Sequence, residues 1–364
     1  MAVKDLHEKP FDEETLAKLS IFEDYAQAWI PTFVMVGESV ICVFDFFAGT
    51  GYDKNAIAGS PIRILQVIKQ YIGHVFQKKV KIQVYFNEYK KAKYDLLVQA
   101  CNQYLTQHKD VGRAIEIKIS NLDFDVCFNQ LLPIIEKYPS LVYLDQNGIK
   151  FLSDKYIHAL EKTFKTDFLY FVSSSYFWRF GEQEEFKTHL NLDIELAKKD
   201  PYSYIHRNLI KQLYSHLPTD STLKLFPFTI KKGANIYGIV FGAKHVRAVE
   251  KFLTIAWKKN PINGDANFDI DNDKGKDQLV LFGDKKLTKI EEFQIRLEEK
   301  IKDQQEVNNI LIYHFTLSEG HTPSHASKHL RDLKKQCKIH YDGSSPKIKY
   351  FSSNKIEEIK IKWL

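Results

Sequence analysis

A short apolar run that opens into a glycine turn constrains the fold of this chain more than any other feature. Residues 40–51 read VICVFDFFAGTG. The first half is a continuous apolar run, which is typical of a strand buried on both faces. Gly49 and Gly51 follow, and glycine permits left-handed dihedrals and a close backbone approach that a β-carbon forbids. Because ligands bind beyond the carboxyl ends of strands in open α/β sheets, this turn predicts a binding site.

Apolar runs and helical patterns alternate along the next part of the chain. Strands are predicted at 40–46, 80–86, 114–119, 141–144 and 168–173, with a helix between each pair. Such an alternation indicates βαβ units and a parallel sheet. Two further runs, 223–231 and 235–241, are joined by a short turn and predict an antiparallel hairpin. We therefore expect an α/β, Rossmann-like sheet of about seven strands whose last strand is antiparallel.

The rest of the chain divides by composition. Residues 14–29 carry apolar side chains at helical spacing, and Pro31 is expected to end that helix. Residues 260–286 contain the polar, acidic string NGDANFDIDNDKGKD. We therefore expect a Rossmann-like domain at 1–259, an acidic linker at 260–286 and a separate C-terminal domain at 287–364.

The C-terminal domain is basic. Residues 321–364 hold ten Lys or Arg and four Asp or Glu. This surplus of six positive charges equals the net charge of +6 of the whole chain. Helices are predicted at 287–305, 307–317 and 321–337, followed by a hairpin of 338–341 with 347–351, and this order is typical of a winged helix. Ala326, Leu330 and Leu333 form the predicted inward stripe of the third helix.

The outward cations of this helix and wing predict contacts with nucleic-acid phosphates. They are Lys328, Arg331, Lys334 and Lys335 on the helix, and Lys347 and Lys349 on the wing. Little room is left between 307–317 and 321 for the short middle helix of a full winged module. The domain could therefore bind a protein partner instead. A third interpretation of its charge is a solvated, lysine-rich surface without a binding role.

The glycine turn lacks the spacing of a dinucleotide fingerprint and the Gly-Lys-Ser/Thr of a P-loop. Its acidic strand end followed by FAGTG resembles the cofactor loop of nucleic-acid methyltransferases, whereas a purely structural turn is the alternative. The resemblance implies S-adenosylmethionine as the cofactor. Its candidate ligands in the turn are Asp45, Phe47, Ala48, Gly49, Thr50 and Gly51.

Two later strand ends complete this candidate site. Glu88 follows the second strand, where a carboxylate can accept hydrogen bonds from ribose hydroxyls, although it could equally cap the next helix. Asn121 and Leu122 follow the third strand and could line the adenine site.

The fourth strand ends in Asp145-Gln146-Asn147-Gly148. At this position amino-methyltransferases carry an Asp/Asn-Pro-Pro-aromatic motif, whose acceptors bind the target amine in the transition state. Asp145 and Asn147 are therefore the candidate catalytic residues. The prolines and the aromatic residue are missing, and a capped turn with Gly148 at the bend is the alternative.

These residues together resemble the three-Cys-motif partner family of bacteria, which is methyltransferase-like. The similarity runs from the helix LAKLSI at 16–21, with Tyr25 and Trp29, through DFFAGTG at 45–51 and Gly59-Ser60-Pro61 to Leu144-Asp145. Only residues 45–61 are specific. The resemblance implies a Rossmann-like class I methyltransferase fold and a companion protein with a three-cysteine motif. The family's usual Asp-Pro-Phe-Gly is Asp-Gln-Asn-Gly here.

Three functions are left open. The first is a methyltransferase that acts on nucleic acid. The second is a catalytically degenerate partner protein that binds nucleic acid or a radical-chemistry companion through its basic domain. The third, an enzyme of another class on the same scaffold, has no supporting pattern. The four cysteines lie too far apart for metal-ligand or redox spacing, so no metal is expected. Without a secretory signal or an apolar run of membrane length, we expect a cytoplasmic protein with no membrane association.

Overall fold

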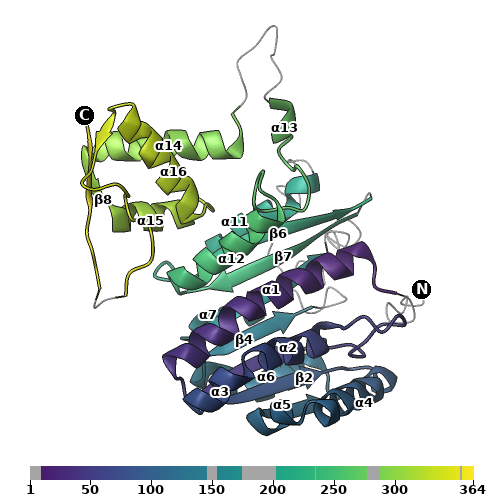
Figure 1. Cartoon of the computed structure of the whole chain (residues 1–364). Coiled ribbons are helices and arrows are strands. Elements are labelled where there is room, and N and C mark those ends of the chain that lie inside the picture. The colour runs from purple at the N-terminus through teal and green to yellow at the C-terminus, as the bar shows by residue number, and fades with distance from the viewer. Residues whose placement is uncertain (1–9, 146–153, 174–201, 234, 277–286, 353–354) are drawn as a thin grey trace. The chain divides into compact units, whose positions relative to one another are not determined.

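The computed structural model describes residues 10–145, 154–173, 202–233, 235–276, 287–352 and 355–364 (Figure 1). By its internal contacts the chain divides into two compact units, Met1–Lys244 and His245–Leu364.

The first unit is an α/β sheet with helices on both faces. Its described elements are α1 (Glu13–Val36), β1 (Val40–Asp45), α2 (Ser60–Gln70), α3 (Ile72–Lys78), β2 (Lys81–Asn87), α4 (Lys91–Gln107), α5 (Lys109–Ala114), β3 (Ile115–Ser120), α6 (Phe124–Lys137), β4 (Ser140–Leu144), α7 (Asp154–Lys162), β5 (Thr166–Ser173), η2 (Tyr202–Tyr204), α11 (Ile205–His216), β6 (Lys224–Lys232) and β7 (Asn235–Ala243).

The strand order of this sheet is β3-β2-β1-β4-β5-β7-β6. β1 pairs in parallel with β2 and β4, whereas β7 pairs antiparallel with both β5 and β6. β1 and β4 lie at the centre, and the order reverses between them, which is where open α/β sheets bind ligands. The order confirms the predicted Rossmann-like, class I methyltransferase-type sheet with an antiparallel last strand.

The prediction that Pro31 ends the first helix is wrong. α1 continues to Val36, and Gly37 ends it with a left-handed φ of 83°. A proline inside a helix leaves the carbonyl four residues earlier without its usual donor. Here that carbonyl belongs to Gln27, and the Tyr71 hydroxyl donates to it over 3.2 Å. A side chain from outside the helix thus supplies the hydrogen bond that the proline cannot make.

Alternate residues of the central strands face different helices. Tyr143 in β4 stacks on Phe22 of α1 at 4.5 Å between ring centroids, and its hydroxyl donates to the Phe22 carbonyl. Phe46, after β1, instead packs against Phe124 and Phe128 of α6. Because side chains alternate along a strand, Asp145 follows Tyr143 on the α1 side. α1 therefore lies over the carboxyl end of β4.

The second unit contains α12 (Val246–Lys259), α13 (Asp273–Lys276), α14 (Lys289–Gln304), β8 (Glu306–Asn308), α15 (Asn309–Ser318), α16 (Pro323–Lys335), β9 (Ile339–His340) and β10 (Lys360–Trp363). A three-stranded sheet of order β8-β10-β9 closes against α14, α15 and α16. The succession from α14 to β10 is that of a winged helix-turn-helix, as predicted.

Two details of that prediction are corrected. The middle helix is present, because α15 occupies that position and α14 is the first helix of the module. Residues 347–351 form no strand, and β9 pairs instead with β10. The buried Asn309 side chain holds the intervening segment, since its Nδ2 donates to the Lys347 and Glu357 carbonyls.

The boundary between the units also differs from the expected one at residue 259. α12 groups with the second unit, where Trp257 Nε1 donates to the Gly320 carbonyl and Tyr313 donates to Glu250. Residues 260–276 of the expected linker are folded. Asn260 and Asn263 are buried, and both donate to the carbonyl of Phe268. The polar composition suggested that these side chains bond to solvent, but the two asparagines make their hydrogen bonds within the protein.

None of the helices in the described ranges is both long and apolar enough to cross a membrane.

Candidate functional site

Hydrogen bonds to Asp45 and to residues at the end of β2 hold the turn after β1 in place. Asp45 ends β1 and is 1% exposed, and its Oδ1 accepts from the Phe47 N–H at 3.1 Å. Glu88 Oε2 accepts from the Gly49 N–H at 3.1 Å, and the Ala48 N–H donates to the Asn87 carbonyl. The predicted turn residues and the predicted acid after β2 therefore lie together.

The glycines are needed where the turn approaches α2 and α4. Gly51 has a φ of +85°, and a β-carbon there would lie 2.8 Å from Cβ of Ala100. The Gly59 N–H donates to the Gly51 carbonyl at 2.8 Å, just before α2 begins. A side chain at position 51 would therefore push the turn away from both helices.

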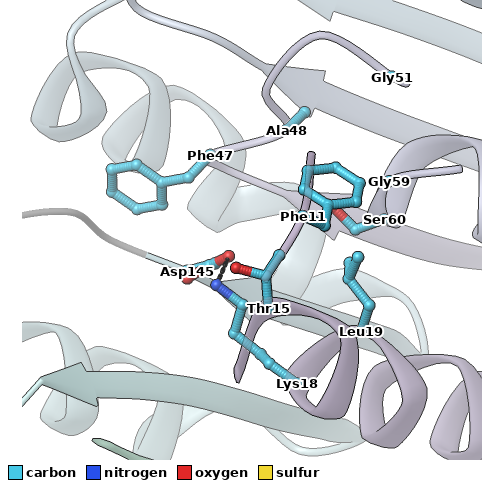
Figure 2. Close-up of a pocket in the computed structure, with 10 residues that line it drawn as sticks. All are labelled: Phe11, Thr15, Lys18, Leu19, Phe47, Ala48, Gly51, Gly59, Ser60 and Asp145. Atoms are coloured by element: carbon cyan, nitrogen blue, oxygen red, sulfur yellow. Dashed lines mark ion pairs between the residues drawn. The ribbon is translucent and has the colours of Figure 1, made fainter. Parts of the chain in front are cut away.

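A pocket lies beside this turn, between α1, the start of α2 and the end of β4 (Figure 2). Phe11 reaches it because its N–H donates to the buried Asp53 carboxylate at 2.8 Å. The lining residues are Phe11, Thr15, Lys18, Leu19, Phe47, Ala48, Gly51, Gly59, Ser60 and Asp145.

An ion pair crosses the pocket. Lys18 Nζ lies 2.5 Å from Asp145 Oδ2, and the two side chains are 9% and 19% exposed (Figure 2). The same ammonium lies 4.3 Å from the centroid of the Phe171 ring in β5. A cation held both by a carboxylate and by an aromatic face in a nearly dry site has little freedom to move.

Two carboxylate oxygens near Lys18 are buried without a hydrogen-bond partner in the described part of the chain, namely Asp45 Oδ2 and Asp145 Oδ1. Burial raises the pKa of Asp45 to about 7, although hydrogen bonds from the Ser60 side chain and the Phe47 N–H oppose the rise. Burial likewise raises the pKa of Glu14, one helical turn before Lys18, to about 7. Orphaned buried acceptors are costly, so this site is suited to a ligand that brings donors or positive charge.

The loops after β2 and β3 are tied to each other. Asn121 Nδ2 donates at 2.7 Å to the carbonyls of both Glu88 and Tyr89. The buried Asn87 side chain bonds the backbone N–H and carbonyl of Leu122. Asn121 thus adjoins Glu88, and the Asn121 Nδ2 and the backbone N–H and carbonyl of Leu122 already have hydrogen-bond partners within the protein.

The structure does not bring every candidate to the pocket. Of the predicted residues, the pocket is lined by Phe47, Ala48, Gly51 and Asp145, and it is not lined by Asp45, Gly49, Thr50, Glu88, Asn121 or Leu122. Thr50 Oγ1 donates to the Tyr52 carbonyl instead. Asn147 lies outside the described residues. Lys18, Ser60 and Asn87 were missed as site residues. A signal for Lys18 exists, because it shares the buried helical stripe of Phe22, Tyr25 and Trp29, where a charge needs a partner.

α16 presents the second candidate site. Ala326, Leu330 and Leu333 are buried, which confirms the predicted inward stripe. Lys328, Arg331 and Lys335 are exposed, and their spacing of three and four residues places them on one helix face. We call these three residues the α16 cation stripe.

Within the stripe, Lys335 Nζ lies 3.7 Å from Asp332 Oδ1 in an exposed ion pair. The other predicted cations have closer contacts within the unit. Lys334 Nζ donates to the carbonyls of Tyr341 and Gly343 and lies 4.1 Å from the Tyr341 ring centroid. Lys347 pairs with Glu357, and Lys349 lies over the Phe351 ring at 5.1 Å. Lys334 therefore anchors the segment after β9, and its charge is not available to a phosphate in this arrangement.

Comparison with known families gives one match for this unit. Residues 267–346 match the GMT-like wHTH domain. The match spans β8, α15, α16 and β9 and includes the α16 cation stripe. No curated protein sequence matches the chain.

Solved structures similar to the chain include methyltransferases. An O-methyltransferase from Bacillus cereus in complex with SAH has 10% identity and a TM-score of 0.32, and the match covers 64% of this chain and 91% of that one. The DszA carbon methyltransferase has 12% identity and a TM-score of 0.34, with coverage of 63% and 55%. Both scores are low, so the fold assignment rests on the strand order described above.

Proposed function

We propose that this chain is an S-adenosylmethionine-dependent methyltransferase that acts on nucleic acid. One observation carries the proposal. The glycine turn, Glu88 and Asp145 meet at the reversal point of a methyltransferase-type sheet, beside two buried carboxylate oxygens without partners. The GMT-like wHTH domain supports nucleic acid as the substrate class.

The residues fit the cofactor. Its ammonium and sulfonium charges would meet Asp45 and its orphaned Oδ2, and Gly49 and Gly51 allow the backbone of the turn to approach. Glu88, which already accepts from the Gly49 N–H, would receive the ribose hydroxyls. Asn121 and Leu122 would shape the adenine wall. Phe47, Ala48 and Thr50 complete the turn.

The chemistry asked of the protein is electrostatic. When bound, the cofactor supplies an electrophilic methyl group. Asp145 Oδ1 would accept a hydrogen bond from the amine of the target base, which makes its nitrogen more nucleophilic as positive charge develops. Asn147 stays a candidate second acceptor. The α16 cation stripe would bind the phosphate backbone of the nucleic acid.

Calorimetry with S-adenosylmethionine tests the cofactor half. Wild type should bind, and Glu88→Ala should bind at least about tenfold more weakly because a charge-assisted hydrogen bond is lost. Glu38→Ala is the matched control, since Glu38 is also half-buried but pairs with Lys165. Absence of binding by wild type contradicts the proposal.

Methyl transfer from labelled cofactor to RNA and to DNA tests the substrate half. Asp145→Ala should abolish transfer while cofactor binding is retained. Label found only on protein, or in neither nucleic acid, contradicts this half of the proposal.

The altered strand-four sequence supports a second candidate, a catalytically degenerate partner protein of the three-Cys-motif partner type. Gln146 and Asn147 replace the proline and the aromatic residue of the family motif. In that case the cofactor binds but no transfer occurs, and the basic unit recruits nucleic acid or a companion protein that carries the three-cysteine motif.

A further inference from the structure

The pocket wall carries one pair of opposite charges, Lys18 and Asp145, and two further carboxyl groups lie behind it. Lys18 is the one cation on its wall among the described residues, and its neighbours Asp145, Asp45 and Glu14 are all carboxyl groups whose charges interact with it. A charge this deep is retained only when it is paired. Lys18 is therefore the group that pairs with the Asp145 carboxylate beside the turn.

The geometry of the pair leaves one carboxylate oxygen for a ligand. Lys18 Nζ binds Asp145 Oδ2, whereas Asp145 Oδ1 is buried with no partner in the described structure. Phe171 holds the ammonium on another side. The ammonium is protonated in such a pair and has no lone pair, so it can orient Asp145 but cannot itself accept a methyl group.

We propose that Lys18 is a positioning residue, which fixes Asp145 so that Oδ1 is directed to the primary amine of the acceptor base. This inference rests on the proposed function. Because Lys18 belongs to α1, the helix becomes part of the site rather than only its cover. Lys18 should affect transfer much more than cofactor affinity, since it contacts Asp145 directly, whereas its charge acts on Asp45 only from a distance and it does not touch the Gly49–Glu88 side of the turn.

The first experiment separates transfer from binding. Lys18→Met should lower kcat by at least about tenfold, the range for loss of one preorganised electrostatic group, while cofactor Kd stays within about threefold. Lys18→Arg should restore part of kcat because it keeps the positive charge. Lys165→Met is the control. Lys165 precedes the first residue of β5, at the end of the strand away from Phe171, and is also ion-paired, so this variant should change neither kcat nor Kd.

The second experiment uses chemical rescue and does not depend on turnover. In Lys18→Ala the missing ammonium leaves a space, and propylammonium should raise the thermal midpoint of this variant but not of wild type. Tetramethylammonium, which has no N–H donor, should fail. Propylammonium should also raise the kcat of Lys18→Ala.

Three results overturn the inference. The first is a wild-type kcat in Lys18→Met, and the second is a cofactor Kd that weakens by as large a factor as kcat falls. The third is a failure of propylammonium to rescue Lys18→Ala. If wild type binds no cofactor, the proposed function fails, and the thermal rescue still decides by itself whether Asp145 and its neighbours form an ammonium site.

Discussion

The pocket beside Asp145 and the outer face of α16 both concentrate charge, but in opposite surroundings. In the pocket the buried Lys18 ammonium is paired with Asp145, whose side chain is 19% exposed, and the fully buried Asp45 lies nearby. On α16, Lys328, Arg331 and Lys335 extend into solvent. Buried charges interact strongly at short range and resist screening by salt, whereas exposed charges act nearly independently and are screened. The two sites should therefore respond to different variables.

The largest expected effect is in the pocket. Asp145→Ala leaves the Lys18 ammonium without its carboxylate and should lower the free energy of unfolding by about 3 kcal/mol, as removal of one partner of a buried pair does. Urea unfolding of the full chain measures this. The loss should be nearly the same in 0.05 M and 0.5 M salt, and a loss that vanishes at high salt would place the pair in solvent.

The α16 cation stripe should show the reverse dependence. Replacing Lys328, Arg331 and Lys335 together by Ala should weaken nucleic-acid binding about 100-fold at low salt and reduce the salt slope by up to about 3, because each phosphate contact releases counterions. Fluorescence anisotropy over a salt series measures both. Lys355→Ala is an exposed control. Affinity indifferent to salt and to the stripe would favour a protein partner.

The pH response sharpens the comparison. Burial raises the pKa of Asp45 to about 7, so the ionised form of this residue destabilises the folded state. The contribution of Asp45 to the free energy of unfolding is therefore highest near pH 4 and falls as the pH rises to about 7. Asp45→Asn cannot ionise, and relative to wild type it should gain about 3 kcal/mol between pH 4.5 and pH 8. Urea midpoints along this range measure the difference, and a pH-independent difference would show that Asp45 is already ionised at pH 4.5.

The second unit should respond to acid instead. Burial lowers the pKa of His321 to about 2, so this histidine stabilises the unit above its unfolded pKa near 6.5 and the contribution is lost as the pH falls below that value. The His321 ring stacks on Phe293 at 4.2 Å between centroids. His321→Phe should therefore remove part of the acid sensitivity of unfolding, and an unchanged pH profile would contradict this.

The smallest effect concerns Lys334, a cation that the sequence assigned to the interface and whose Nζ donates to two carbonyls in the structure. Lys334→Met loses two hydrogen bonds to carbonyls and a cation–π contact, which should lower the unfolding free energy by about 1 kcal/mol. Its effect on nucleic-acid affinity should be below twofold. A loss as large as that of Lys328→Ala would show that Lys334 leaves its carbonyl partners to bind phosphate.

The sequence predicted the elements that local patterns encode. Continuous apolar runs marked the central strands, and FAGTG marked the turn, because burial and positive φ restrict which residues can occupy these positions. The inward stripe of α16 followed from helical spacing alone. These are properties of short segments.

The sequence could not show contacts between distant segments. The Tyr71 hydroxyl donates to the carbonyl that Pro31 leaves without a donor in α1. The strand that pairs with β9 is β10 and not residues 347–351. Lys18 meets Asp145 only because α1 crosses the end of β4. Each depends on which segments the fold brings together, and no local pattern contains that information.

The position of β10 has a consequence for synthesis. Both β8 and β9 pair only with this strand in the described sheet, and α15, α16 and β9 lie between β8 and β10 in the chain. On the ribosome, α14, α15 and α16 can form early, but the sheet that fixes the wing cannot close until residues 360–363 emerge. Two unpaired strand edges stay exposed during that interval, which is the period when a nascent chain is open to pairing with a neighbour.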